Sequence, residues 1–408
     1  MRQTFQMRFS ERVKKLSVFE PGAPYQSHRI SAMAAQMKGE DAIDSTSNAI
    51  PMDTPAAVKE AAKKALDEGY TSSAPLVGLP ELRGAIARKL EKMDGIRADP
   101  ETEIIVTHGA QEAIFLAIQA LVEPGDEVIE CSPDYPFYLN IENASGIPVY
   151  VPLRKNENWR LESKDFETAV TPKTRMIALD SPHNPTGRVF TRAELEGIAQ
   201  VARNHDLIVI SDVANEMLLW DGRKNINIAS LPGMQERTIT TSSVSKCYGM
   251  SGWRVGYACG NRDLIFQMSK LHAVACNVGP ATFAQKGAAA LYEKLPEIME
   301  GLLEPYEKKR DFAVRRLNEM PRLHCHKPEG GAVLIPDISE YGMTSLQFAE
   351  WLLREAKVAA APGSGYLAEG HVRVNFGEPR LEELLDRFDK ALEKLAPLPS
   401  QLLKSRET

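Results

Sequence analysis

The sequence lacks long apolar runs: nowhere do the roughly 18 uninterrupted apolar residues of a membrane-spanning helix occur. Its first segment, Met1–Leu16, mixes charges with isolated apolar residues and has no apolar stretch of secretory length. A basic excess is also missing, since the formal net charge is −6, which argues against a surface that binds nucleic acid. We therefore predict a cytoplasmic protein that has neither a membrane nor a nucleic acid as its partner.

Cysteine is scarce and follows no ligand pattern. The chain has five cysteines, and none of them stands in the CxxC spacing that is typical of zinc or redox sites. Scattered thiols in odd number suit a reducing compartment better than a disulfide framework. The sequence thus predicts free thiols and no metal site.

The remaining composition is ordinary for a globular protein, because 43% of the 408 residues are hydrophobic and 25% are charged. A chain of this length suits two domains. Short β-branched runs alternate with longer helical patterns, as in the expected strand Glu103–Thr107 and the expected helix Gln111–Val122. This alternation predicts an α/β domain with a mostly parallel sheet. Further strands are expected at Glu127–Cys131, Val149–Leu153, Arg175–Leu179, Leu207–Ser211, Thr238–Thr241 and Val255–Cys259, and a helix at Arg192–Asn204.

The two ends of the chain differ from this middle. The first 55 residues are mixed and irregular, and a long charged helical stretch is expected at Lys294–Asn318. A short α+β pattern then ends in His371–Phe376, followed by a final helix over Leu381–Leu395 and a frayed last dozen residues. We predict a three-layer α/β/α large domain over residues 56–292 and a smaller α+β domain formed by residues 1–55 and 293–408.

Three expected strands end in polar residues. Lys246 lies in Thr240–Gly256, where a strand ends in hydroxyl residues and leads to a glycine-rich turn. Asp212 directly follows another apolar strand, and so does the segment SPHNPTG, which contains Asn184. Alone, such a lysine is more often a solvated loop charge. Because the carboxyl ends of parallel strands meet at one sheet edge, the three together predict a ligand site.

The NPTG and SxSK…R motifs, in this order and spacing, resemble those of the aspartate aminotransferase superfamily, the class I/II aminotransferases among the fold-type I enzymes of pyridoxal 5′-phosphate (PLP). The resemblance runs from about Ile43 to Phe376. It implies that Lys246 forms a Schiff base with PLP and then shuttles the α-proton of the substrate. It also implies that Asp212 keeps the pyridine nitrogen protonated and that Asn184 donates to the phenolic oxygen of the ring.

The resemblance further implies a set of ligands for the cofactor phosphate. A strand-to-helix junction supplies backbone N–H groups and a helix dipole, which attract an anion, and an arginine suits bidentate contact. The matching residues are Gly109, Ala110, Gln111, Ser243, Ser245 and Arg254.

Three more residues match family positions around the substrate. Tyr70 matches a tyrosine that reaches the phosphate of the neighbouring subunit, which implies a homodimer with shared active sites. Tyr135 matches the aromatic residue that stacks on the pyridine ring, although an unmatched aromatic residue is more often part of a core. Arg373 matches the arginine that clamps the substrate α-carboxylate as a fork.

The chain departs from the family pattern close to the expected cofactor. Asn215 stands where the family has a tyrosine that also donates to the phenolic oxygen, so we expect it near the cofactor as a shorter donor. Asn48 replaces a glycine beside the substrate, and Ile50 replaces a proline. The loop over residues 72–77, between Tyr70 and Gly78, is longer than usual.

These departures leave the reaction type open. The first hypothesis is an aminotransferase that moves the amino group of an α-amino acid to a 2-oxo acid. The second is a lyase or cyclase of the same fold type that performs β- or γ-elimination, replacement or ring closure. A third, a regulatory protein that kept the fold without catalysis, is disfavoured by the complete set of Lys246, Asp212, Asn184 and Arg373. The sequence does not determine the substrate side chain.

Overall fold

The computed structural model describes residues 8–19, 23, 25–37, 39 and 41–395. The predicted frayed end therefore lies outside the described residues. The first half of the chain forms α1 (Glu11–Lys14), α2 (Gln26–Gln36), β1 (Ile43–Asp44), α3 (Ala56–Asp67), α4 (Pro80–Asp94), β2 (Ile104–Thr107), α5 (Ala110–Leu121), β3 (Glu127–Ser132), α6 (Tyr138–Asn143), β4 (Ile147–Pro152), α7 (Ser163–Ala169), β5 (Thr174–Asp180) and α8 (Arg192–Asn204). The second half forms β6 (Ile208–Asp212), β7 (Thr238–Ser243), β8 (Gly256–Cys259), α9 (Arg262–Ala275), α10 (Thr282–Glu293), α11 (Leu295–Met299), α12 (Glu304–Glu319), β9 (Val333–Leu334), α13 (Ser345–Ala356), β10 (Val358–Ala359), β11 (Ala361–Pro362), β12 (Val372–Asn375) and α14 (Leu381–Leu392).

A seven-stranded sheet forms the centre of the molecule. Its strand order is β2-β8-β7-β6-β5-β3-β4, and every neighbouring pair is parallel except those that include β8. Every strand that the sequence predicts in this region is present, with bounds that differ by at most a few residues. The mostly parallel sheet is thus confirmed.

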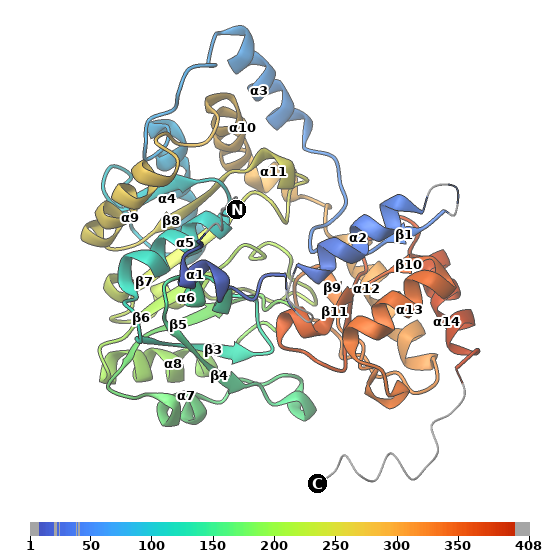
Figure 1. Cartoon of the computed structure of the whole chain (residues 1–408). Helices are drawn as coiled ribbons and strands as arrows, with labels where there is room; N and C mark the ends of the chain where they lie inside the picture. The colour runs from blue at the N-terminus through green and yellow to red at the C-terminus, as the bar shows by residue number, and fades with distance from the viewer. Residues whose placement is uncertain (1–7, 20–22, 24, 38, 40, 396–408) are drawn as a thin grey trace, which may run out of the picture.

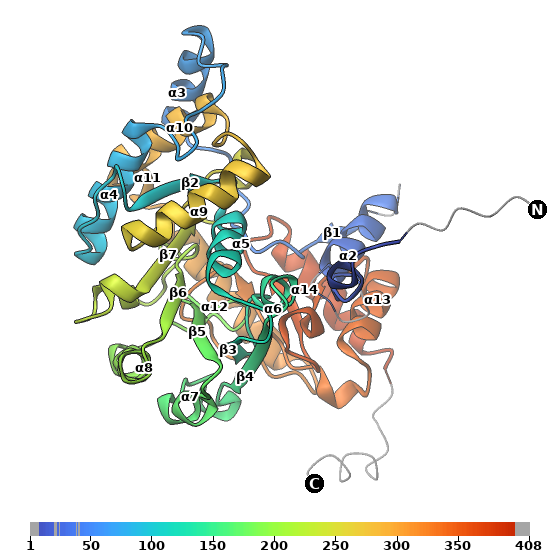
Figure 2. The same ribbon diagram turned by 60° about the vertical axis from the view of Figure 1, so that its left-hand side comes forward.

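Helices cover both faces of this sheet, as strand β5 shows. Met176 and Ala178 pack into a core with α5 and α9, whereas Ile177 and Leu179 pack into a second core with α7 and α8. Side chains of a strand alternate between faces, so a strand with apolar residues on both must lie between two layers. Figure 2 shows α5 and α9 on one side of the strands and α7 and α8 on the other. The predicted three-layer α/β/α architecture is confirmed.

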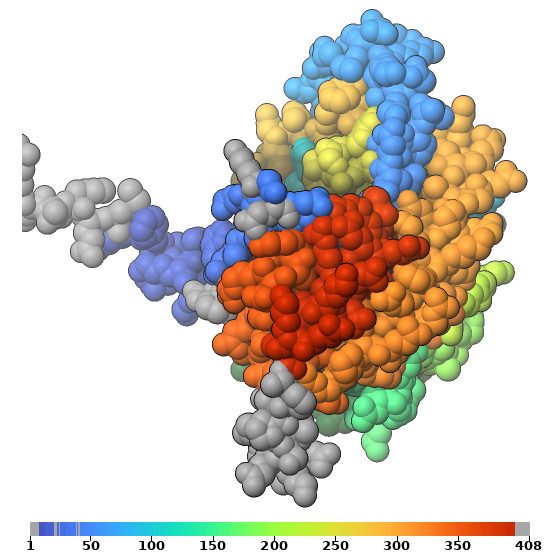
Figure 3. All heavy atoms as spheres, turned by 90° about the vertical axis from the view of Figure 1, so that its right-hand side faces the viewer, coloured from blue at the N-terminus to red at the C-terminus, as the bar shows by residue number. Residues whose placement is uncertain are grey.

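The two ends of the chain associate in a second, smaller α+β region. Strand β1 near the N-terminus pairs in parallel with β10, and β11, β12 and β9 form a small antiparallel sheet. Figure 1 places α2 and β1 beside α12, α13 and α14, and Figure 3 shows the blue N-terminal segment against the orange and red surface. The exact domain bounds stay a prediction.

Two expectations for the chain ends are wrong. Residues 26–36, expected to be irregular, form helix α2, whose Ile30 and Ala34 are buried at helical spacing. The expected single helical stretch Lys294–Asn318 divides into α11 and α12. Gly301 between them has a φ of +68°, which an α-helix does not allow, and Pro305 lies in the first turn of α12, where proline is tolerated.

Helix α8 has the bounds that the sequence predicts, and its capping explains why. The Thr191 side chain accepts a hydrogen bond from the Glu194 N–H, and Glu194 Oε2 accepts one from the Thr191 N–H at 2.7 Å. This reciprocal capping box satisfies N–H groups that the first turn leaves free. Among the described residues, no helix has the length and apolar character needed to cross a bilayer.

Candidate active site

Three neighbouring strands bring the predicted residues to one sheet edge. Asp212 is the last residue of β6, Lys246 follows β7 by three residues, and Asn184 follows β5 by four. Strands β5, β6 and β7 are adjacent and parallel, so their carboxyl ends open into the same space. The predicted convergence of a lysine, a carboxylate and an amide is therefore observed.

Lys246 is partly buried and has a perturbed amine. Burial and the nearby charge of Arg373 lower the pKa of Lys246 from its ordinary value to about 8, although Asp212 opposes this shift. Its backbone carbonyl accepts a hydrogen bond from the N–H of Ile50 at 3.3 Å, which ties the N-terminal segment to the lysine loop. A lysine with this pKa is largely available as a neutral nucleophile in mildly alkaline solution.

Asp212 is buried at the end of β6. Burial raises its pKa to about 6, while the N–H of Ala214, which donates to Asp212 Oδ1 at 2.9 Å, and the charge of Lys246 act in the opposite direction. The backbone hydrogen bond fixes the carboxyl group beyond the strand end. A cationic group placed against it would favour its ionised form.

Arg373 of β12 comes from the small region and enters the same site. Its guanidinium donates through Nη1 to Asn184 Oδ1 at 3.0 Å and through Nη2 to the Thr46 carbonyl at 2.8 Å, and it lies 4.2 Å from the ring centroid of Tyr366. The side chain is buried, and Nε has no hydrogen-bond partner among the described residues. The positioned guanidinium therefore retains donors for a further anion, such as a carboxylate.

A buried polar network holds Asn184 from behind. Asp180 Oδ2 accepts from the Asn184 N–H at 2.8 Å, and His183 Nδ1 lies 2.7 Å from Thr186 Oγ1. His183 Nε2 faces Asp134 Oδ1 at 3.5 Å, and burial lowers the pKa of this histidine. The imidazole is fully buried, so it supports the loop and does not reach substrate.

The predicted phosphate ligands form a cradle at the start of α5. Gly109 precedes the helix with a φ of +84°, and a Cβ atom there would lie 2.6 Å from Arg254 Nη2. Arg254 donates to the carbonyls of Ser251 and His108, while the N–H of Ser245 donates to Ser243 Oγ. No side chain caps the first turn of α5, so its N–H groups are available to an anion.

A cavity of about 350 Å³ lies at this junction. Five predicted residues line it, and the sequence prediction missed several others that α2, the segment after β1 and the loop before β12 contribute. Ser27 and His28 lie four and three residues before Ser31 on α2, a helical spacing that would have revealed them if a helix had been expected. The predicted lining residues are Asn48, Tyr135, Asn184, Lys246 and Arg373, and the missed ones include Ser27, His28, Ser31, Thr46, Ser47 and Tyr366.

Other predicted residues lie elsewhere or make different contacts. Tyr70 is outside this cavity; the residue is 37% exposed, and Lys286 Nζ lies 4.1 Å from the centroid of its ring. Asn215 is buried and donates through Nδ2 to the Pro182 carbonyl at 3.4 Å, two residues before Asn184. Tyr135 donates through its hydroxyl to Gln111 Oε1. This bond joins the expected stacking residue to the phosphate cradle.

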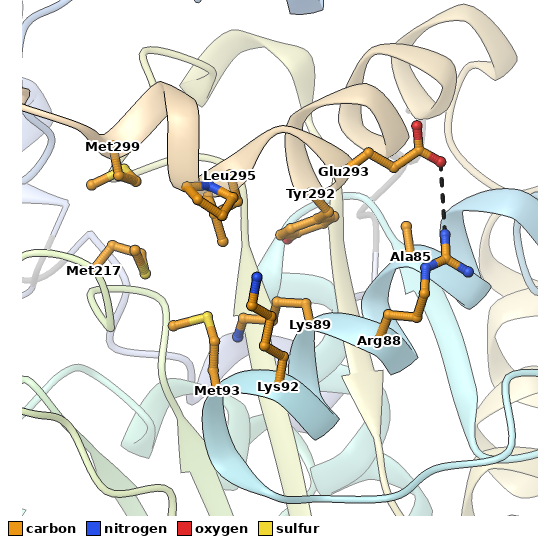
Figure 4. Close-up of a pocket in the computed structure, with 11 residues that line it drawn as sticks. Ala85, Arg88, Lys89, Lys92, Met93, Met217, Tyr292, Glu293, Leu295 and Met299 are labelled. Carbon is orange, nitrogen blue, oxygen red and sulfur yellow. Dashed lines mark ion pairs between the residues drawn. The ribbon is translucent and has the colours of Figure 1, made fainter.

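A second cavity of about 410 Å³ has a different chemistry. It lies between α4, α10 and α11, and Met93, Met217 and Met299 point into it (Figure 4). Lys89, at its base, already makes an ion pair with Glu216. Its lining is mainly apolar, its buried lysine is paired, and Lys92 at its rim is exposed, so this cavity lacks the buried amine with a lowered pKa that marks the Lys246 cavity.

Comparisons with known proteins agree with this geometry. The family model described as aminotransferase class I and II matches residues 40–388. The chain is 39% identical to aromatic-amino-acid aminotransferase 2 of Thermococcus litoralis over 84% of this chain and 89% of the relative. It is 40% identical to an aspartate aminotransferase of Pyrococcus abyssi over 90% of this chain and 96% of the relative. A Thermus thermophilus aspartate aminotransferase structure with maleate superposes with a TM-score of 0.88 at 33% identity, covering 95% of this chain and 100% of that chain.

The fold and the site together define an α/β enzyme with a lysine at the carboxyl edge of its sheet. The chain belongs to the aminotransferase class I and II family. It is a PLP-dependent aminotransferase of fold type I, which confirms the first hypothesis from the sequence and disfavours a lyase or cyclase.

The residues present fit PLP. A Cβ atom at position 109 would collide with the Arg254 guanidinium, so only glycine keeps the start of α5 and Arg254 open to an anion. Beyond it lie an amine with a lowered pKa and a buried carboxyl group, as the cofactor aldehyde and ring nitrogen require. A phosphate, an aldehyde and a protonated pyridine thus have one matching group each.

Proposed function

We propose that Lys246 holds PLP covalently and that this site moves the amino group of an α-amino acid to a 2-oxo acid. The observation that carries the proposal is the convergence of Lys246, Asn184 and Arg373 around one cavity, with the buried carboxyl group of Asp212 close enough to Lys246 to affect its pKa. When bound, PLP supplies an electron sink that stabilises negative charge at the substrate α-carbon. All other steps depend on groups of the protein itself.

The side chains would divide the work as follows. Asp212 would hold the proton on the ring nitrogen, since a buried carboxylate is stabilised by a neighbouring cation. Asn184 uses its Oδ1 to accept from Arg373, which leaves its Nδ2 to donate to the phenolic oxygen. Gly109, Ser243, Ser245 and Arg254 would bind the phosphate.

Arg373 would bind the substrate α-carboxylate and thereby orient the α-carbon toward Lys246. Contacts with Asn184, the Thr46 carbonyl and the Tyr366 ring hold the guanidinium before substrate arrives, so little conformational entropy is lost on binding. Lys246 would then take the α-proton as a base and return it as an acid, which a pKa near neutrality favours.

The substrate side chain would face a wall of α2 and the segment after β1. Ser27, His28 and Ser31 present hydroxyl and imidazole groups there, and Asn48 adds an amide. These groups suit hydrogen bonds with a polar substrate side chain. The similarity to an aspartate aminotransferase and to an aromatic-amino-acid aminotransferase makes aspartate and the aromatic amino acids the first candidates.

The decisive experiment is a half-reaction. Holoenzyme is mixed with aspartate or an aromatic amino acid without any 2-oxo acid, and absorbance and products are followed. Lasting loss of the visible cofactor band, with one equivalent of the matching 2-oxo acid formed and the band restored by 2-oxoglutarate, supports the proposal. Continuous product release with retention of the band would instead indicate elimination.

We also propose a homodimer in which Tyr70 completes the partner's phosphate site. Tyr70 lies outside its own chain's cavity, three residues after the end of α3, and its carbonyl accepts a hydrogen bond from Thr282 Oγ1 at 2.5 Å. Tyr70→Phe and Lys246→Ala variants, each impaired, should regain activity when unfolded and refolded together, because one site of each hybrid is then intact. Absence of such complementation would contradict a shared site.

The remaining predictions follow from the same picture. All five cysteines are free, which suits the reducing cytoplasm proposed for the protein. We propose residues 56–292 as the cofactor-binding domain and residues 1–55 with 293–408 as the small domain. The pairing of β1 with β10 supports a small domain made of both chain ends.

A further inference from the structure

Two helices bring four metal-ligating side chains together beside the phosphate cradle. Glu112 lies in the first turn of α5 and His108 two residues before that helix, while His272 lies in the last turn of α9 and Cys276 directly follows it. Helix α5 packs directly against α9 (Figure 2), which brings the two pairs of residues together. One donor atom from each of the four lies within 4.8 Å of the other three.

Glu112 is the centre of this group. Its Oε2 lies 2.8 Å from His108 Nδ1, and its Oε1 lies 3.1 Å from His272 Nδ1 and 3.0 Å from Cys276 Sγ. His272 is fully buried, and its Nε2 has no hydrogen-bond partner among the described residues. The imidazole is thus aimed into the group through Nδ1.

We propose that His108, Glu112, His272 and Cys276 bind a zinc ion. Two imidazole nitrogens, one thiolate and one carboxylate form the mixed, borderline-soft donor set that Zn²⁺ prefers. In a tetrahedral site with bonds of about 2.0–2.3 Å, the donor atoms lie roughly 3.3–3.8 Å apart. The distances from the Glu112 carboxylate oxygens to His108 Nδ1, Cys276 Sγ and His272 Nδ1, now 2.8, 3.0 and 3.1 Å, would have to increase by ~1 Å or less to admit the ion.

The ion would have a structural role. With four protein donors it keeps no open position for substrate, which is the arrangement of structural zinc sites. It would join α9 to His108, the residue before Gly109. The carbonyl of His108 already accepts a hydrogen bond from Arg254 Nη2 at 3.2 Å. The absence of cysteine pairs, from which the sequence predicted no metal site, does not exclude a set with a single thiolate.

A metal titration of the holoenzyme tests the proposal without relying on activity. The protein is treated with a chelator, dialysed with PLP, titrated with Zn²⁺ and analysed for bound metal per chain by elemental mass spectrometry. We expect one zinc per chain, with affinity lowered on the order of 10- to 100-fold or more by His272→Gln or Cys276→Ser. His205→Gln is the control, because it makes the same change in another His–Glu pair, in which His205 Nε2 lies 2.6 Å from Glu167 Oε1 nearer the surface and away from the proposed site.

Cobalt gives an independent spectroscopic signature. Co²⁺ bound at this site should show a near-ultraviolet thiolate charge-transfer band, absent from Cys276→Ser and present in the control Cys325→Ser, whose thiol lies elsewhere. Lack of stoichiometric zinc binding by the unmodified protein would overturn the proposal, even if a variant failed to fold. Zinc binding or a cobalt band that survives both His272→Gln and Cys276→Ser would overturn it as well.

Discussion

Lys246 and Lys89 both lie inside the α/β part of the molecule, yet their surroundings give them opposite properties. The Lys89 side chain is only 1% exposed and makes an ion pair with Glu216; burial opposes its charge, but Glu216 and Asp94 outweigh burial and its pKa is raised. For Lys246, burial and Arg373 prevail over Asp212, and the pKa falls to about 8. Burial lowers the pKa of a lysine, and a neighbouring carboxylate raises it. A lysine therefore becomes reactive where the carboxylate offsets only part of the effect of burial.

The two cavities beside these lysines show the same contrast. The cavity in Figure 4 is the larger, at about 410 Å³, but methionine, leucine and tyrosine side chains dominate its wall. The cavity at Lys246, of about 350 Å³, is lined by hydroxyl, amide and guanidinium groups. The ability to bind and convert a substrate follows from unpaired polar groups and not from volume.

The largest expected effect is that of Lys246→Ala. Removing the amine eliminates the proton carrier, so transamination should fall on the order of 10⁴-fold. Steady-state turnover with 2-oxoglutarate measures this. The matched control is Lys92→Ala, which makes the same change at an exposed lysine of the second cavity and should leave turnover unchanged. Equal turnover of Lys246→Ala and Lys92→Ala would contradict a catalytic role for Lys246.

Lys89→Met should damage stability instead of chemistry. It leaves Glu216 buried without its cation, which costs about 3–5 kcal/mol of the free energy of unfolding, measured by urea denaturation. The double change Lys89→Met with Glu216→Leu should recover most of this loss, since an apolar pair replaces the ion pair. If the single variant is as stable as the parent, Lys89 does not compensate a buried charge.

Arg373→Lys should weaken substrate binding. Lysine keeps the charge but cannot form a fork with a carboxylate, so kcat/KM for amino acids should fall roughly 10- to 100-fold, mainly through KM. A primary amine without a carboxylate serves as control substrate, and its slow reaction should change little. A similar loss for both substrates would contradict the assignment of Arg373 to the α-carboxylate.

The smallest effect is a pH dependence. Only the neutral amine attacks an aldehyde, so the rate of PLP uptake by the cofactor-free protein should rise up to pH about 8 and level off above it. The burial and the Arg373 charge that lower the pKa of Lys246 set this midpoint. Stopped-flow absorbance measures the rate. A rate that keeps rising toward pH 10.5, the ordinary lysine value, would contradict a lowered pKa.

Much of the large sheet and its site was predictable because local patterns determine them. Strand β6 is an apolar run that ends in Asp212, and helix α8 begins at a capping box that the sequence displays. Lys246 and Asn184 follow such strands directly. Adjacent parallel strands then place these residues together without further information.

The residues that the sequence did not predict depend on long-range packing. Helix α2 carries Ser27 and His28 to the cavity only because it packs on α13, far along the chain. The contact of Tyr366 with Arg373 depends on the pairing of β11 with β12. The His272–Glu112 contact joins residues 160 positions apart, a separation that no local pattern reveals.

The most direct test of the central claim is the position of the cofactor link. Holoenzyme is reduced with borohydride, digested, and each lysine peptide is weighed by mass spectrometry. The mass of reduced PLP should appear on the peptide that contains Lys246 and be absent from the one that contains Lys89. Labelling at another lysine, or at none, would contradict the assignment of Lys246 as the cofactor-bearing residue.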